Sequence, residues 1–207
     1  MSKRAKIEQD FRTLLEIIEQ QRPGYTAGLG TGLSDKEIEE RIKIHPISEG
    51  LFAIYSCVKG GYFQGKDIYS TDFIPGFYLI SVNSINAEIK GWEETYKKYL
   101  GDTLWQPDMI PFLKNGAGDY YCVRTLPNDQ SVVEIFKGSP ELWVICQSLE
   151  DFILIITECY KQNVYFVDEY GDLECQWDLV EEIIAKFNPN YYSQNELEPP
   201  SERRAED

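Results

Sequence analysis

The stretch over residues 104–146 constrains the fold of this chain most, because short strand-like segments alternate there with turn-forming residues. Each segment is rich in β-branched or aromatic side chains, and the segments are separated by turn signals such as Asn-Gly-Ala-Gly and Pro-Asn-Asp. The expected strands span 109–113, 119–123, 132–136 and 142–146. This spacing is typical of an antiparallel meander.

Helical periodicity brackets the expected sheet on both sides. Ser34 and Glu37 form the pattern of a capping box at the start of one short helix. The helices expected from apolar spacing and end signals span 7–18, 34–43, 47–58, 84–99, 148–161 and 178–187. Two more strands are expected at 77–81 and 164–167. This order predicts an α+β fold, in which a central, mostly antiparallel sheet contains every strand and is flanked by helices.

The chain shows one long folded region and a polar end. No linker or internal repeat interrupts residues 5–187, and a length of 207 residues suits a single hydrophobic core. We therefore expect a single domain over 1–187. Residues 188–207 carry two basic and five acidic groups, a net charge of −3, and their end lacks an apolar face. We expect this segment to be a mobile acidic tail.

The charge balance excludes whole classes of partner. With 20 Lys+Arg against 35 Asp+Glu the net charge is −15, and such a surface repels phosphate backbones and anionic lipid headgroups. We expect neither a nucleic-acid nor a membrane partner. Residues 105–187 hold five basic and fifteen acidic groups, a net charge of −10. They form a candidate docking face for a basic protein, although an ordinary acidic protein surface has the same composition.

The sequence offers little for catalysis or metal binding. His45 is the only imidazole, and its place before Pro46 at an expected helix junction favours a local structural role over general-base catalysis. Five widely spaced cysteines lack the close pairing that zinc sites use, and no calcium-binding loop pattern occurs. Paired-carboxylate hydrolysis stays open on composition alone. We expect no enzyme, no cofactor and no metal.

The expected location is the cytoplasm. An odd number of cysteines within apolar stretches is typical of reduced, buried thiols. The N-terminus lacks the pattern of a signal peptide, and the longest apolar run is far shorter than the roughly 20 residues that cross a bilayer.

A glycine-rich segment, Gly28-x-Gly30-x-Gly32, could suggest phosphate binding by backbone N–H groups. It lacks the preceding strand, the P-loop lysine and the glycine spacing of nucleotide-binding loops. A flexible connection between helices is the favoured interpretation.

A family resemblance lies in residues 105–122. They read Trp-Gln-Pro-Asp-Met-Ile-Pro-Phe-Leu and then, after Lys114, Asn-Gly-Ala-Gly-Asp-Tyr-Tyr-Cys. This resembles the SUKH superfamily of fungal cell-wall-assembly regulators and bacterial toxin-immunity proteins, with its Ile-Pro-Phe strand, Gly-rich turn and Gly-Asp-x-x-Cys-type strand. Segments 32–38, 51–61, 73–81 and 148–161 resemble other parts of the family in the same order, so that about residues 30–187 are covered. Arg124 departs from the pattern, because many members are expected to carry an acidic residue there.

The resemblance implies an α+β fold and a protein that binds other proteins without catalysis. It favours an immunity protein that neutralises a cognate toxin by stoichiometric binding, and an acidic inhibitor suits the basic cleft of a nuclease toxin. The alternative is a regulatory scaffold of cell-wall assembly or signalling with the same fold. The predicted contact residues are acidic or aromatic groups at expected strand ends and turns: Asp119, Tyr120, Glu134, Asp168, Glu169 and Asp172.

Overall fold

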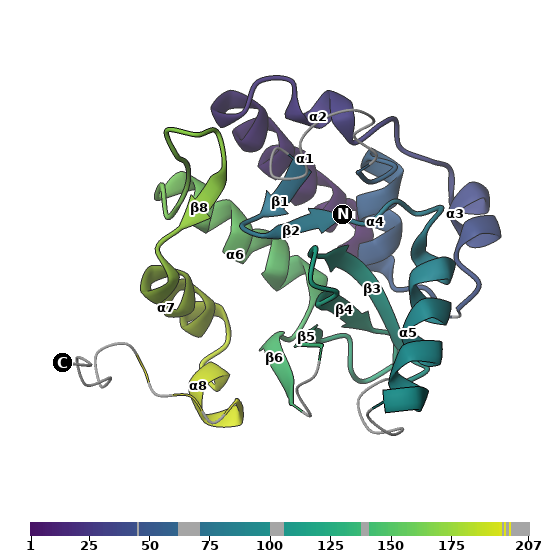
Figure 1. The fold of residues 1–207 in the computed structure, drawn as a ribbon. Coiled ribbons are helices and arrows are strands. Elements are labelled where there is room, and N and C mark those ends of the chain that lie inside the picture. Colours follow the sequence, from purple (N-terminus) through teal and green to yellow (C-terminus); the bar gives the residue numbers. More distant parts are fainter. Residues whose placement is uncertain are drawn as a thin grey trace.

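An antiparallel sheet with the strand order β1-β2-β3-β4-β5-β6 forms the centre of the computed structural model (Figure 1). The structure describes residues 1–44, 46–61, 71–99, 106–137, 141–195, 197 and 199, with the side chains of 95–99 left outside this description. The strands of the sheet are β1 (Asp72–Ile74), β2 (Phe77–Leu79), β3 (Met109–Lys114), β4 (Tyr120–Arg124), β5 (Val132–Ile135) and β6 (Leu142–Cys146). Each strand pairs with the next one in the chain, so the predicted meander and the α+β fold are confirmed.

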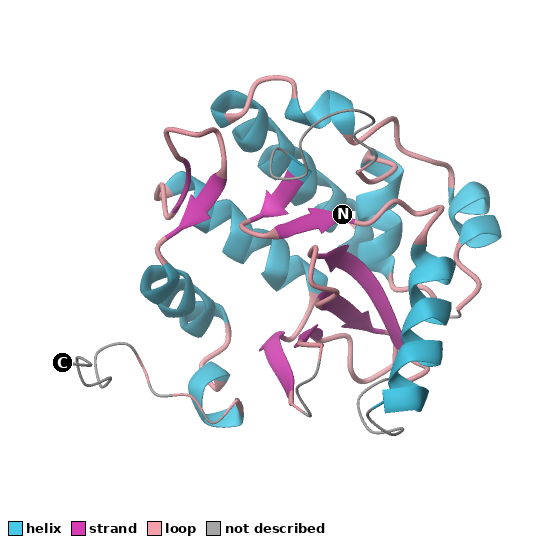
Figure 2. Ribbon diagram, in the orientation of Figure 1, coloured by secondary structure: helices cyan, strands magenta, loops and turns pink. Residues whose placement is uncertain are grey.

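Helices surround the strands (Figure 2). They are α1 (Lys3–Gln21), α2 (Tyr25–Gly28), α3 (Asp35–Arg41), α4 (Glu49–Cys57), α5 (Ile85–Tyr99), α6 (Leu149–Lys161), α7 (Trp177–Phe187) and α8 (Tyr191–Gln194). The predicted helices are confirmed to within a few residues at their ends. Sequence periodicity does not predict the short helices α2 and α8, because four residues are too few to show a helical period.

Two neighbouring tyrosines of β4 show how the layers are arranged. The Tyr120 ring packs edge-on against Trp92 of α5, with ring centroids 5.4 Å apart. The Tyr121 ring lies 5.5 Å from the ring of Phe152 in α6. Because consecutive side chains of a strand point to opposite faces, α5 covers one face of the sheet and α6 covers the other. Helices α1 and α4 pack behind α6 and complete that second layer.

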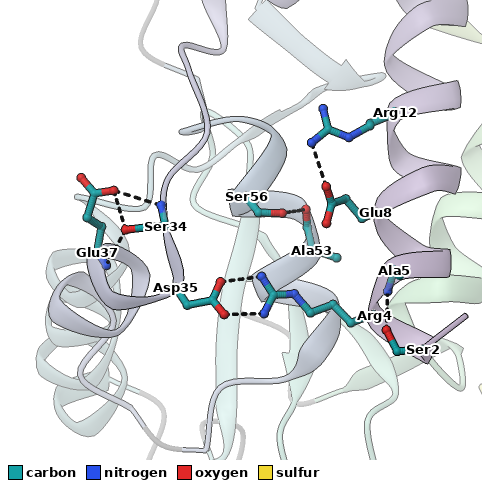
Figure 3. Close-up of polar contacts among 10 residues, drawn as sticks. All are labelled: Ser2, Arg4, Ala5, Glu8, Arg12, Ser34, Asp35, Glu37, Ala53 and Ser56. Carbon is teal, nitrogen blue, oxygen red and sulfur yellow. Dashed lines mark hydrogen bonds and ion pairs between the residues drawn. The ribbon is translucent and has the colours of Figure 1, made fainter.

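The capping box predicted at Ser34 is present and holds the start of α3 (Figure 3). The Glu37 carboxylate accepts from the Ser34 N–H at 2.9 Å, and the Glu37 N–H donates to Ser34 Oγ at 3.4 Å. Arg4 of α1 donates to both oxygens of Asp35 at 2.6 and 2.5 Å, which ties α3 to α1. The two short helices expected around 34–58 are therefore confirmed, whereas the junction residue His45 lies outside the described residues.

The glycine loop connects helices as expected, and close packing and backbone conformation explain two of its glycines, Gly32 and Gly30. A Cβ atom at Gly32 would lie only 2.0 Å from the carbonyl oxygen of Ser56 in α4. Gly30 has a φ of +70°, which favours glycine. The loop adjoins a shallow hollow of about 550 Å³ that is lined by Glu16, Glu19 and Arg12 among others. Two carboxylates beside the loop disfavour a phosphate there.

The expectation that every strand belongs to one sheet is wrong. The strand expected at 164–167 is β7 (Tyr165–Val167), and it pairs antiparallel with β8 (Leu173–Cys175) in a separate two-stranded sheet. The tight turn between them explains this local pairing, because Asp168 Oδ1 accepts from the backbone N–H groups of Tyr170 and Asp172 at 2.8 and 2.9 Å. The hairpin lies beside α6 and forms no ladder with the central sheet (Figure 1).

Residues 188–195, at the start of the segment expected to be a mobile tail, pack against the central sheet. Helix α8 packs against β6, and Tyr191 is buried. Asn195 Oδ1 accepts from the N–H of Val144 at 2.8 Å, and its Nδ2 donates to the Val144 carbonyl at 3.0 Å. The Asn195 amide therefore occupies the free edge of the sheet much as a further strand would. Most of 196–207 lies outside the described residues, and the single-domain organisation stays a prediction.

Close packing at Gly32 predicts a stability loss on substitution. We expect Gly32→Ala to lower the free energy of unfolding by about 1–3 kcal/mol, because the backbone of α4 must move away from the added methyl group. Gly91→Ala is the control, since Gly91 is exposed on α5, an added methyl group would meet no atom there, and alanine favours helices. Chemical denaturation should show the first variant destabilised and the second unchanged or stabilised by about 0.5–1 kcal/mol.

Capping of the sheet edge by Asn195 gives a second prediction. Asn195→Ala removes the two hydrogen bonds to Val144 and a third to the carbonyl of Tyr191, and we expect a loss of about 1–3 kcal/mol in the free energy of unfolding. Ser193→Ala is the matched control, because Ser193 is an exposed residue of α8 whose hydroxyl donates to the nearby carbonyl of Asn190. Equal stability of both variants in urea denaturation would show that the edge does not need this cap.

Candidate functional site

A cavity of about 390 Å³ lies between the central sheet and the C-terminal part of the chain. The first wall comes from the sheet, α6 and the turn between β1 and β2, and includes Tyr121, Glu134, Phe136, Trp143 and Phe152. The second wall comes from β7, α7 and α8, and includes Tyr165, Trp177, Val180, Glu181 and Tyr191. The volume falls in the range of about 300–1,000 Å³ that is usual for ligand pockets.

Glu134 is a buried carboxyl group within this largely apolar cavity. It is paired across the strands with Tyr121, and its exposed fraction is only 7%. Burial raises the pKa of Glu134 to about 8, against a lowering by the hydrogen bond with Tyr121 and a further rise from the charge of Asp119. At neutral pH the group is therefore largely protonated, since ionisation without a cation nearby is costly in an apolar site.

The chemistry of the cavity walls favours one kind of guest. Eight of the lining residues are aromatic, and the lining carboxylates are Glu134 and Glu181. No Lys, Arg or His occurs among the described residues that line the cavity. Aromatic faces and carboxylates both attract cations, so the walls suit a guest with an apolar body and a positive charge.

Trp177, which lines the cavity, belongs to an exposed apolar and acidic surface. Its apolar members are Phe166, Val167, Tyr170, Trp177 and Leu179. Tyr170 is 81% exposed and Trp177 is 59% exposed. Its acidic members are Asp168, Glu169, Asp172, Glu174, Asp178, Glu181 and Glu182, and residues 162–185 contain no Lys, Arg or His. We call this region, on β7, β8 and α7, the hairpin surface.

The predicted contact residues fall into two groups. Asp168, Glu169 and Asp172 belong to the hairpin surface. Asp119 instead supports the turn between β3 and β4, where it accepts from Asn115 Nδ2 at 2.6 Å and from the Lys137 N–H at 2.7 Å. Tyr120 is 5% exposed and donates to Glu88 of α5 at 2.7 Å. Glu134 lines the cavity, so the structure does not bring the six residues together on one face.

Other acidic groups of the sheet region are engaged within the protein. Arg124 pairs with Asp108 at 3.2 Å and with Asp129 at 2.7 Å. Lys114 pairs with Glu88 at 2.7 Å. The arginine that departs from the family pattern therefore contacts two carboxylates of the same sheet region.

The predicted contact residues omit the aromatic part of the hairpin surface. Trp177 belongs both to this surface and to the cavity wall, and Tyr170 is largely exposed. The signal in the sequence is a stretch, 162–185, that combines acidic and aromatic residues without any basic residue. The separation of this stretch from the sheet depends on the local pairing of β7 with β8, which strand patterns do not specify.

The fold and the site define an α+β domain with an exposed, acidic and aromatic surface suited to protein binding. Residues 32–155 match the model of the SMI1 / KNR4 family (SUKH-1). This match spans more than half of the chain, and the chain belongs to this family. Membership supports a protein-binding role. The comparison with curated proteins gives no match.

Two further features of the described residues bear on other classes of function. None of the helices in that part of the chain is both long and apolar enough to span a membrane. No group of three or more His, Cys, Asp or Glu residues is placed there so that it could hold a metal ion.

The buried carboxyl group predicts a pH-dependent stability. Because the pKa of Glu134 is higher in the folded chain than in the unfolded chain, folding takes up a proton, and this group lowers stability as pH rises from about 4.5 to about 8. We expect Glu134→Gln to remove that loss, so the variant should exceed the wild type in unfolding free energy by an amount that grows between pH 5 and pH 9. The difference should reach the order of a few kcal/mol.

The measurement is urea denaturation of both proteins across this pH range. Glu174→Gln is the control, because Glu174 is an exposed residue of β8. Asp72 also has a raised pKa, about 6, but it is present in every variant and cancels in the difference. A constant difference between wild type and Glu134→Gln at all pH values would contradict the raised pKa of Glu134.

Proposed function

We propose that this protein is a cytoplasmic immunity protein that neutralises a cognate toxin with a basic surface by stoichiometric binding. The observation that carries the proposal is the hairpin surface, where exposed aromatic and aliphatic side chains stand among seven acidic residues with no basic residue in 162–185. Large aromatic anchors surrounded by charge complementary to the partner are typical of specific protein interfaces.

The position of the hairpin surface relative to the family match supports the proposal. The match ends at residue 155, and the surface lies on residues 166–182 beyond it. A surface outside the shared part of a family is free to differ between members, as recognition of different toxins requires. The five free cysteines, three of them buried, suit the reducing cytoplasm in which we place the interaction.

In this mechanism electrostatic steering affects the rate of association, and aromatic packing affects the rate of dissociation. The field of the acidic groups speeds the approach of a basic toxin and orients it toward the hairpin surface. Trp177 and Tyr170 then lose their exposed apolar area to the partner, which lengthens the lifetime of the complex. The bound toxin loses access to its substrate because its basic cleft is covered, so the inhibitor needs no catalytic group of its own.

Co-expression with the toxin encoded next to this chain tests the proposal. We expect the wild type to protect cells and to form a stoichiometric complex. Reversal of three exposed charges on the hairpin surface, Glu169→Lys, Glu174→Lys and Glu182→Lys, should weaken the complex more than tenfold and abolish protection. Trp177→Ala should weaken it by roughly thirtyfold if this residue is an anchor.

A triple charge reversal in the N-terminal part of the chain is the matched control. Glu16→Lys, Glu39→Lys and Glu40→Lys change the net charge equally at exposed positions of α1 and α3, and this variant should keep both complex and protection. Absence of protection and of a complex with the wild type would overturn the proposal. Recovery of cell-wall enzymes as specific, wild-type-only partners would favour the regulatory scaffold instead.

A further inference from the structure

We infer that the cavity between the sheet and α7 is the receptor for one long cationic side chain, a lysine or arginine, that the partner protein inserts when it docks on the hairpin surface. The inference rests on the proposed function, because the side chain that enters the cavity belongs to the partner protein. It adds the chemistry by which that partner is recognised.

The cavity combines the two features that hold a buried cation. Aromatic rings from both walls, among them Phe136, Trp143 and Trp177, line the cavity, and the face of an aromatic ring attracts a cation. The carboxyl group of Glu134, next to Tyr121, supplies a counter-charge within a lining that has no described basic residue. An aliphatic stem packs against the apolar walls while its charged end reaches the carboxylate.

Access to the cavity leads from the hairpin surface. Trp177 is largely exposed and lines the cavity, so it forms part of the opening. Phe136, Trp143 and Glu181 are half-buried, whereas Glu134 is buried. This gradient of burial places the acid at depth and Phe136, Trp143 and Trp177 nearer to solvent. A partner that contacts Trp177 therefore lies next to the opening through which a side chain would enter.

The ionisation of Glu134 accounts for the preference of the cavity for a cation over a neutral guest. Before a guest binds, the carboxyl group is protonated at neutral pH, because burial raises its pKa to about 8. When an ammonium or guanidinium group enters, the carboxyl releases its proton to solvent and the resulting carboxylate pairs with the cation. The net exchange is one cation bound and one proton released, and no other species takes part.

The surroundings of Glu134 contain no competing cation among the described lining residues. The titratable groups near it are Asp119 in the turn after β3, Tyr121 on β4, Tyr165 on β7, Glu181 on α7 and Tyr191 on α8. Burial raises the pKa values of Tyr121 and Tyr165 well above their usual value, so both stay neutral. Lining residues from β6 and α6 are not ionisable.

The test uses small molecules that copy the guest, so it needs no toxin. n-Butylguanidinium and n-butylammonium are titrated into the full chain and followed by the methyl signals of isoleucines that line the cavity: Ile74, Ile145, Ile155, Ile156 and Ile184. n-Butanol is the neutral control of similar shape. At pH 8.5 we expect both cations to shift these signals and to bind at least tenfold more tightly than n-butanol.

Two variants separate the carboxylate from the rest of the cavity. Glu134→Gln should weaken binding of the cations at least tenfold and leave n-butanol binding unchanged, while Glu39→Gln, at an exposed position of α3, should behave as the wild type. For the wild type, affinity for the cations should rise about tenfold per pH unit between pH 6 and 7 and level off above pH 8. Equal binding of n-butanol, or equal binding by Glu134→Gln, would overturn the inference.

The outcome is distinct from that of the toxin experiment. If cations bind in the cavity but the protein does not protect against the toxin, the cavity remains a receptor for a cationic side chain and the toxin is refuted as its partner. Toxin protection that is unaffected by Glu134→Gln would retain the immunity function and refute the cavity as part of its interface. Where both hold, Glu134→Gln should also weaken the toxin complex more than tenfold.

Discussion

The alternation of side chains along β4 sets the arrangement of the layers in this protein. Tyr120 packs on Trp92 of α5, and the next residue, Tyr121, packs on Phe152 of α6. A central strand that buries an aromatic ring on each face requires a helical layer on both sides. On the α6 side, the hydroxyl of Tyr121 also meets Glu134, so a polar pair is buried where the core would otherwise continue. The cavity lies beside this buried pair of Tyr121 and Glu134.

The C-terminal segment lies beyond the part of the chain that matches the family model. The family match covers residues 32–155, which include the central sheet and the first half of α6. Beyond it, β7, β8 and α7 supply the second wall of the cavity, and Asn195 caps the edge of β6. This segment therefore both encloses the cavity and carries the hairpin surface.

Net charge indicates a type of partner more readily than a place of contact. Residues 105–187 carry the excess of acid, but Asp108 and Asp129 are paired with Arg124, and Asp119 is used in a turn. Of the six predicted contact residues, only Asp168, Glu169 and Asp172 lie on the hairpin surface. A charge count cannot separate paired from unpaired carboxylates, because pairing depends on neighbours that are distant in sequence.

Elements that depend on local interactions can be predicted from the sequence alone. Examples are the meander, the capping box at Ser34 and the main helices. Each follows from periodicity, turn residues or end signals that lie close together in the sequence. Long-range packing decides instead that β7 pairs with β8 outside the main sheet, that Asn195 takes the free edge of β6, and that Glu134 is buried. These outcomes depend on which surfaces meet when the chain folds, and that information is not contained in any short stretch of sequence.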